Sequence, residues 1–146
     1  MAQSNHRYMD VAQLNEDLLN LVEKKQELSG LTYNDPEYDD VEEELHDRED
    51  DFVENYGDYL EDALHSVHDE YCPDDDVLLP TAYLANEYIF SEVDGQLKVD
   101  VPAKEGVMVM CDDFPGKVCR LVLLPNPTRI VLKIGTNEEN VAWEAK

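Results

Sequence analysis

Apolar residues recur near the start of the chain with the spacing of an amphipathic helix. Between Tyr8 and Ser29 they return every three or four positions, and only Lys25 interrupts the series. The members of this heptad-like stripe are Val11, Leu14, Leu18, Leu21 and Leu28. Such spacing places the apolar side chains on one helix face. We therefore predict a helix from about Tyr8 to Ser29, ended by the left-handed conformation that Gly30 tolerates.

A second, longer stripe follows a short turn. Asn34 or Asp35 can cap a new helix, and Pro36 suits its first position. The apolar positions of this stripe are Tyr38, Val41, Leu45, Phe52, Tyr56, Tyr59, Ala63 and Val67. Pro73 ends the pattern, so we predict a helix from about Pro36 to Tyr71. Two amphipathic helices joined by a short turn should pack as an antiparallel, coiled-coil-like hairpin.

The two predicted helices differ in length. The second outruns the first from about Leu60 to Tyr71, where its apolar content is also richer. This end of the helix needs a cover other than the first helix, and the C-terminal half of the chain is the available one.

After Asp74 the period of the pattern changes from helical to alternating. Two strand-like segments, 88–93 and 96–101, flank Asp94-Gly95, a pair that suits a tight hairpin turn. Further strand candidates are 107–111, 117–124 and 129–134. These segments predict five or six antiparallel strands in a sheet, sandwich or small barrel. The predicted fold class is α+β, with an acidic helical hairpin over 1–73 and a β-rich unit over 74–146, packed together as one compact chain.

The formal net charge of −24 is concentrated in one segment. Between Asp35 and Asp76 there are 20 acidic residues and one basic residue, Arg48. A negative field of this density repels phosphate backbones and anionic lipid, so we expect no direct binding to nucleic acid or to a membrane. Basic protein surfaces and divalent cations are the electrostatically natural partners. The alternative is that the charge only keeps the protein soluble.

Several features favour a cytoplasmic location. No apolar run approaches the roughly 20 residues that a membrane span needs. The polar residues 1–7 lead directly into the amphipathic segment, so we expect no signal peptide. Cysteines occur at Cys72, Cys111 and Cys119, without a CxxC spacing, and we expect reduced thiols.

The residues that could carry chemistry do not form a recognisable catalytic motif. Glu43 with His46, and Asp62 with His65, form two carboxylate-x-x-His pairs that are 19 residues apart. Such pairs can hold a metal, but sites of this kind draw ligands from four helices, so a two-helix hairpin would have to dimerise. The histidines flank the apolar stripe, which favours solvated side chains. We predict no metal and no cofactor.

The layout of the chain resembles that of bacterial transcript-cleavage factors of the Gre type. Gly30 followed by Glu37-Tyr38 is similar to the Gly…Glu-Tyr run near the Gre tip. The resemblance covers the layout and these few residues. Where that family places its metal-holding acids, this chain has Leu31 and Asn34. By analogy alone, the resemblance implies that the acidic hairpin is presented to a polymerase.

We therefore predict a non-enzymatic adaptor or regulator that binds a basic protein through the long second helix. The residues expected to bind the partner recur on the outward side of the apolar stripe, and they are Glu43, Asp47, Asp50 and Glu54. The alternatives are a Gre-like transcription cofactor and a metal-dependent hydrolase formed by dimerisation.

Overall fold

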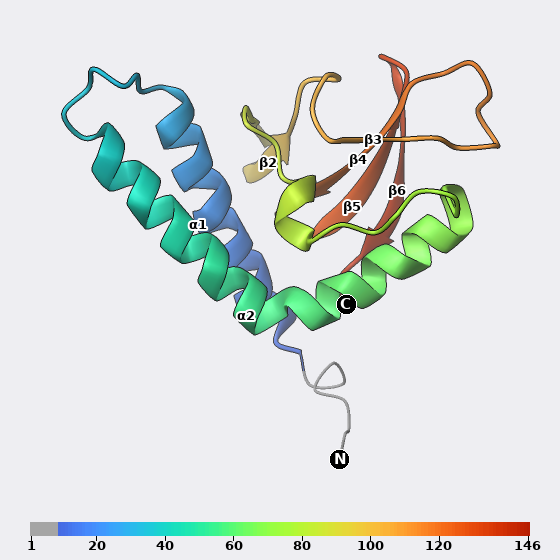
Figure 1. The fold of residues 1–146 in the computed structure, drawn as a ribbon, viewed down its shortest axis with the longest axis horizontal. Helices are drawn as coiled ribbons and strands as arrows, with labels where there is room; N and C mark the ends of the chain where they lie inside the picture. Colours follow the sequence, from blue (N-terminus) through green and yellow to red (C-terminus); the bar gives the residue numbers. More distant parts are fainter. Residues whose placement is uncertain (1–8) are drawn as a thin grey trace.

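A computed structural model describes residues 9–146, which form a helical hairpin followed by antiparallel strands (Figure 1). The helical elements are α1 (Val11–Ser29), α2 (Tyr38–Tyr71) and the short 3-10 helix η2 (Pro80–Tyr83). The strands are β1 (Ile89–Val93), β2 (Gln96–Asp100), β3 (Val107–Val109), β4 (Cys119–Leu124), β5 (Arg129–Ile134) and β6 (Glu138–Glu144). The predicted α+β fold class is confirmed. The expected helix start at Tyr8 and the polar segment 1–7 lie outside the described residues.

Helix α1 buries the stripe that the sequence predicts. The carboxylate of Asp10 accepts a hydrogen bond from the backbone nitrogen of Gln13 at 3.0 Å and so caps the first turn. The buried side chains of α1 are Leu14, Leu18, Leu21 and Val22. Gly30 follows the helix with φ −88°, which is not left-handed, so the predicted conformation at this residue is wrong.

The turn between the helices also differs from the expected one. The carboxylate of Asp35 accepts a hydrogen bond from the backbone nitrogen of Thr32 at 2.8 Å. Asp35 therefore closes the turn and does not cap the next helix. Helix α2 begins at Tyr38, after Glu37, which makes no side-chain capping hydrogen bond. The predicted start at Pro36 was two residues early.

Helix α2 packs against two different partners along its length. Its first part lies against α1, and it continues through Gly57 and bends near its middle (Figure 1). Its second part runs beneath the β-rich half, where the ring of Tyr59 meets the ring of Trp143 from β6 with 5.7 Å between centroids. Leu64 and Val67 are buried in this part. The prediction that the C-terminal half covers the end of this helix is confirmed.

The strands form two antiparallel sheets, one of β1 and β2 and one in the order β3-β4-β5-β6. Alternate residues of β5 face opposite sides of the larger sheet. The guanidinium of Arg129 and the ammonium of Lys133 donate to β2 residues, at 3.0 Å to the carbonyl of Val99 and 3.0 Å to the carboxylate of Asp100. The opposite side faces α2 and η2, since Trp143 lies opposite Ile130 in the β5–β6 register.

Strand β6 is missing from the predicted set. Glu138 to Val141 are exposed, as suits an edge strand, and this stretch lacks the regular apolar alternation that marks a half-buried strand. A single cluster of buried hydrophobic residues connects the two halves, from Leu14 in α1 to Ile134 in β5. Within residues 9–146, no helix has both the length and the apolar composition required to cross a membrane.

Candidate functional site

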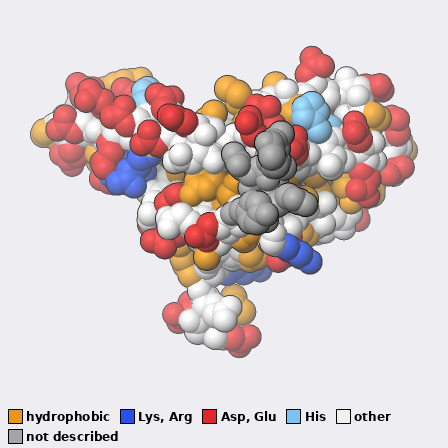
Figure 2. Space-filling model, turned by 90° about the horizontal axis from the view of Figure 1, so that it is seen from below, with side chains coloured by type: hydrophobic (Ala, Val, Ile, Leu, Met, Phe, Trp, Pro, Cys, Tyr) orange, Lys and Arg blue, Asp and Glu red, His pale blue; other side chains and the backbone are white. Residues whose placement is uncertain are grey.

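The residues expected to bind a partner lie on the outward side of the hairpin part of α2. Glu43, Asp47, Asp50 and Glu54 are all exposed. Their spacing of three or four residues places them along one helix face. Figure 2 views the molecule from below, and acidic side chains crowd its left end, where the hairpin lies.

Acids that face α1 behave differently, because lysines of α1 neutralise them. The ammonium of Lys24 lies 2.8 Å from the carboxylate of Glu44, and that of Lys25 lies 3.9 Å from Glu49. Arg48 also binds Glu44, at 2.9 Å. Hydrogen bonds from Lys24 and then Arg48 hold the pKa of Glu44 below its ordinary value. Lys24, Lys25 and Arg48 are therefore engaged with Glu44 and Glu49.

The four outward acids have no such neighbours. Within residues 9–146, none of the side chains of Glu43, Asp47, Asp50 and Glu54 makes a hydrogen bond or an ion pair. Arg48 is the single basic residue between Asp35 and Asp76, and it binds Glu44. The structure thus separates two paired acids, Glu44 and Glu49, from the unpaired row of four toward solvent. Sequence periodicity predicted the side but could not show which acids are paired.

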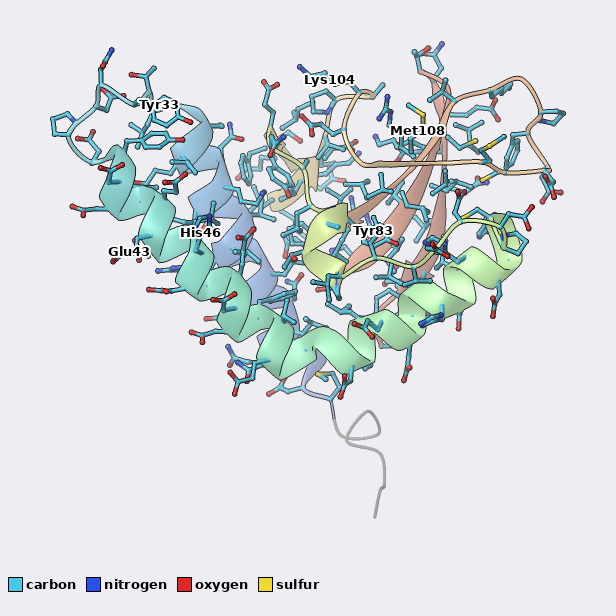
Figure 3. The ribbon with its side chains drawn as sticks, in the orientation of Figure 1. Tyr33, Glu43, His46, Tyr83, Lys104 and Met108 are labelled. Carbon is cyan, nitrogen blue, oxygen red and sulfur yellow. The ribbon has the colours of Figure 1, made fainter. Side chains whose placement is uncertain are left out.

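An aromatic pair marks the tip of the hairpin. Tyr33 is 85% exposed, and its ring contacts that of Tyr38 with 4.8 Å between centroids (Figure 3). Glu37, from the Gre-like run, is exposed beside them. The apolar pattern of the sequence does not single out Tyr33, because this residue lies outside both stripes. An exposed aromatic side chain at the end of an acidic arm is well suited to contact a partner.

The carboxylate-x-x-His pairs do not form a common site in this chain. Glu43 and His46 lie on the hairpin part of α2, away from Tyr83 and the strands (Figure 3). Asp62 and His65 follow 19 residues later. A straight helix of that length spans roughly 28 Å. No group of three or more histidine, cysteine, aspartate or glutamate side chains among residues 9–146 is placed to hold a metal ion.

His68 contradicts the expectation of solvated histidines. It is 2% exposed, and its ring bridges two segments that follow α2. Nδ1 lies 3.0 Å from the carbonyl oxygen of Asp75, and Nε2 lies 2.9 Å from the hydroxyl of Tyr83. His46 and His65 are exposed as expected. The helix pattern alone could not reveal the burial of His68, because η2 covers it.

The three cysteines are free and buried in the hydrophobic cluster. Burial raises the pKa of the Cys72 thiol to about 11, and the carboxylate of Asp75 adds to the effect. Burial, followed by the neighbouring thiol of Cys119, raises the pKa of Cys111 to about 12. A thiol needs to lose its proton to act as a nucleophile. These values favour a structural role for Cys72 and Cys111.

Comparison with known proteins gives no lead: no family model, no curated protein and no solved structure matches this chain.

Proposed function

We propose that this protein is a non-enzymatic adaptor or regulator whose acidic arm binds a basic protein surface. The arm is the part of α2 that packs against α1 and carries Glu43 to Glu54, together with α1 itself. The observation that supports the proposal is the row of Glu43, Asp47, Asp50 and Glu54, which are exposed and unpaired within the described chain.

The charge of the arm acts mainly on the rate of encounter. Exposed charges project a field over about 8 Å at physiological ionic strength. A field of this reach steers a basic partner toward the arm and speeds association, while it has less influence on release. Tyr33 at the tip supplies a contact that salt screens little, because much of the energy of an aromatic contact comes from buried area.

The test begins with capture of partners from the native host at low and moderate salt, followed by kinetics with the purified partner. The arm variant combines Glu43→Gln, Asp47→Asn, Asp50→Asn and Glu54→Gln. These side chains are exposed, so the fold should survive. We expect a lower association rate with a shallower dependence on salt, and a dissociation rate that changes less.

A matched control separates the arm from the net charge of the whole chain. Asp74, Asp76, Asp112 and Asp113 are also exposed and lie outside α2. Their replacement by Asn changes the charge by the same amount. Binding that is weakened equally by both quadruple variants would show that the net charge of the chain acts, and not the arm. Binding that is weakened by neither would show that the acids only make the protein soluble. Either outcome would overturn the proposal.

A Gre-like cofactor is a second candidate that uses the same arm. The observation that favours it is the exposed Glu37 at the tip, beside Tyr33 and Tyr38. This function predicts that the chain stimulates transcript cleavage by the host RNA polymerase, and that Glu37→Gln abolishes the effect. The absence of stimulation would exclude this candidate and leave the adaptor proposal to its own test.

A further inference from the structure

A surface cavity lies in the β-rich half, remote from the acidic row of α2. Its volume is about 690 Å³, within the range of small-molecule sites, roughly 300–1,000 Å³. Three loop segments supply most of its wall, 103–104, 116–118 and 135–138, and the side chain of Arg120 on β4 also lines it. Lys104, from the first of these segments, lies at the top of the β-rich half in Figure 3.

Arg120 is an unpaired cation in this wall. It is half-buried, and within residues 9–146 its guanidinium makes no hydrogen bond or ion pair. The register of the sheet explains why. Its cross-strand neighbours are Met108 on β3 and Lys133 on β5, and neither offers an acceptor. Lys133 instead has Glu139 opposite it on β6 and binds that carboxylate at 2.9 Å. Glu139 therefore pairs with Lys133, and Arg120 is left without a partner.

Two lysines add to the positive charge of the cavity. Lys104 binds Glu87 at 2.9 Å, and Lys117 binds Glu138 at 2.7 Å. All four side chains are at least half exposed, and exposed pairs of this kind contribute little energy. A ligand can therefore compete for either ammonium group. The lining holds three of the eleven Lys and Arg residues of the chain and one acid, Glu138, although the whole chain carries −24.

One glycine allows the 102–106 segment to approach β4 beside Arg120. Gly106 has φ +107°, a conformation that other residues rarely adopt. A side chain there would place its Cβ 2.8 Å from the carbonyl oxygen of Leu121 and 3.3 Å from the Cβ of Arg120. The segment is thus held close against the strand that carries Arg120. This contact gives the cavity a preformed wall.

We propose that this cavity binds a small organic anion with one carboxylate on an apolar body. The guanidinium of Arg120 suits a carboxylate, because its fork can donate two parallel hydrogen bonds. Ala103 and the half-exposed Val118 offer apolar surface in the same wall. Charge complementarity points to an anion, and the volume points to a ligand of metabolite size. This site is independent of the acidic arm and of its partner.

The test uses the full chain labelled with ¹⁵N and titrated with phenylacetate, a carboxylate on an aromatic body. We expect saturable shifts of the amide signals of Gly116, Gly135 and their neighbours at millimolar ligand or below. Phenylacetamide, a neutral isostere, should bind at least tenfold more weakly. Arg120→Gln should also lose at least tenfold in affinity, whereas Arg48→Gln, with the same change of charge on α2, should leave the affinity unchanged.

A second variant keeps the test decisive if Arg120→Gln does not fold. Val118 is 53% exposed, so Val118→Glu should fold while placing a negative charge in the wall. This variant should also bind phenylacetate at least tenfold more weakly than wild type. The proposal is overturned by no saturable shift with phenylacetate, by equal affinity for phenylacetamide, or by unchanged affinity in a folded Arg120 or Val118 variant. Inorganic phosphate that binds the same amides more tightly than phenylacetate would also overturn it.

Discussion

The hydroxyl oxygen of Tyr83 lies 2.9 Å from Nε2 of His68 and 3.0 Å from the backbone nitrogen of Leu78. The N–H of Leu78 can only donate, so the hydroxyl accepts that bond and has its own proton available for Nε2. On the other side of the ring, the carbonyl of Asp75 can only accept. Both hydrogen bonds are satisfied when His68 is neutral and carries its proton on Nδ1.

The first prediction concerns this tautomer. In the folded protein near pH 7, the imidazole ¹⁵N chemical shifts of His68 should report a protonated Nδ1 and an unprotonated Nε2. The exposed His46 and His65 serve as internal controls and should show the tautomer mixture of a solvated ring. A protonated Nε2 on His68 would contradict the assignment of donors and acceptors around Tyr83.

The second prediction concerns the stability that the Tyr83 hydroxyl contributes. Tyr83→Phe leaves Nε2 of the buried His68 without this partner, and it also removes the acceptor of the half-exposed Leu78 N–H. The free energy of unfolding should fall by about 1–3 kcal/mol. The matched control is Tyr33→Phe at an exposed position, which should change it by less than about 0.5 kcal/mol. Urea denaturation of both variants measures the difference, and equal stabilities would refute the role of the hydroxyl.

The third prediction concerns the bond between α2 and α1 at Tyr56. Its hydroxyl donates to the carboxylate of Asp17 at 2.5 Å, and Tyr56→Phe should cost about 1.5–3 kcal/mol. Burial and then this hydrogen bond raise the pKa of Tyr56 above its ordinary value. A raised folded-state pKa means that the contribution is complete below about pH 10 and is lost as the pH rises through the folded value. The stability gap between wild type and Tyr56→Phe should narrow above pH 10, and a constant gap would contradict this.

The fourth prediction concerns the Lys133 ion pair with Asp100. Burial favours the neutral form of Asp100, but hydrogen bonds from the backbone of Val101 and from Lys133 outweigh it and hold its pKa below the ordinary value. The pair should therefore stabilise the fold above about pH 4, and this stabilisation should be lost as the pH falls through the folded pKa. Lys133→Met removes this pair together with the ion pair to Glu139, and it should lower the free energy of unfolding by about 1–3 kcal/mol at pH 7.

Thermal unfolding measures this effect: the difference in stability between wild type and Lys133→Met should become smaller below pH 4. Lys98→Met is the matched control, because Lys98 is an exposed lysine on β2. It should change stability by less than about 0.5 kcal/mol at pH 7. A Lys133→Met variant as stable as the control would refute the contribution of the pair.

The fifth prediction concerns thiol reactivity. Burial and raised pKa values should make Cys72 and Cys111 slow to react with Ellman's reagent at pH 8 in the folded protein. Denaturant should expose them and make the reaction fast. Val118→Cys places a thiol at a half-exposed position and should react quickly without denaturant. Rapid reaction of Cys72 or Cys111 in the native state would contradict the burial of these thiols.

The helices were predictable because their apolar stripes are long. The second stripe continues through Gly57 without a change of period, and the structure keeps one helix there. The turn chemistry was less predictable, because Asp35 can either cap a helix or close a turn, and the bond to Thr32 decides between these options. The edge strand β6 was missed because an exposed strand loses the alternation that reveals a half-buried one.

The features of the candidate sites depend on contacts that a pattern cannot encode. The outward acids of α2 followed from the helical period, but their lack of partners depends on which acids Lys24 and Lys25 reach. The isolation of Arg120 depends on strand register, since a shift of one residue would move its side chain to the other face of the sheet. The burial of His68 depends on Tyr83, fifteen residues away in a short helix without a periodic pattern.

The continuity of α2 has a mechanical consequence. The same helix supplies Leu45 to the packing against α1 and Val67 to the part that the β-rich half covers, and its backbone runs unbroken between them. A load applied at the tip passes through the backbone hydrogen bonds of α2 to the sheet. The arm is therefore connected to the β-rich half by a continuous helix and not by a flexible linker. A protein bound to the arm would be held at a set distance from the cavity beside Arg120.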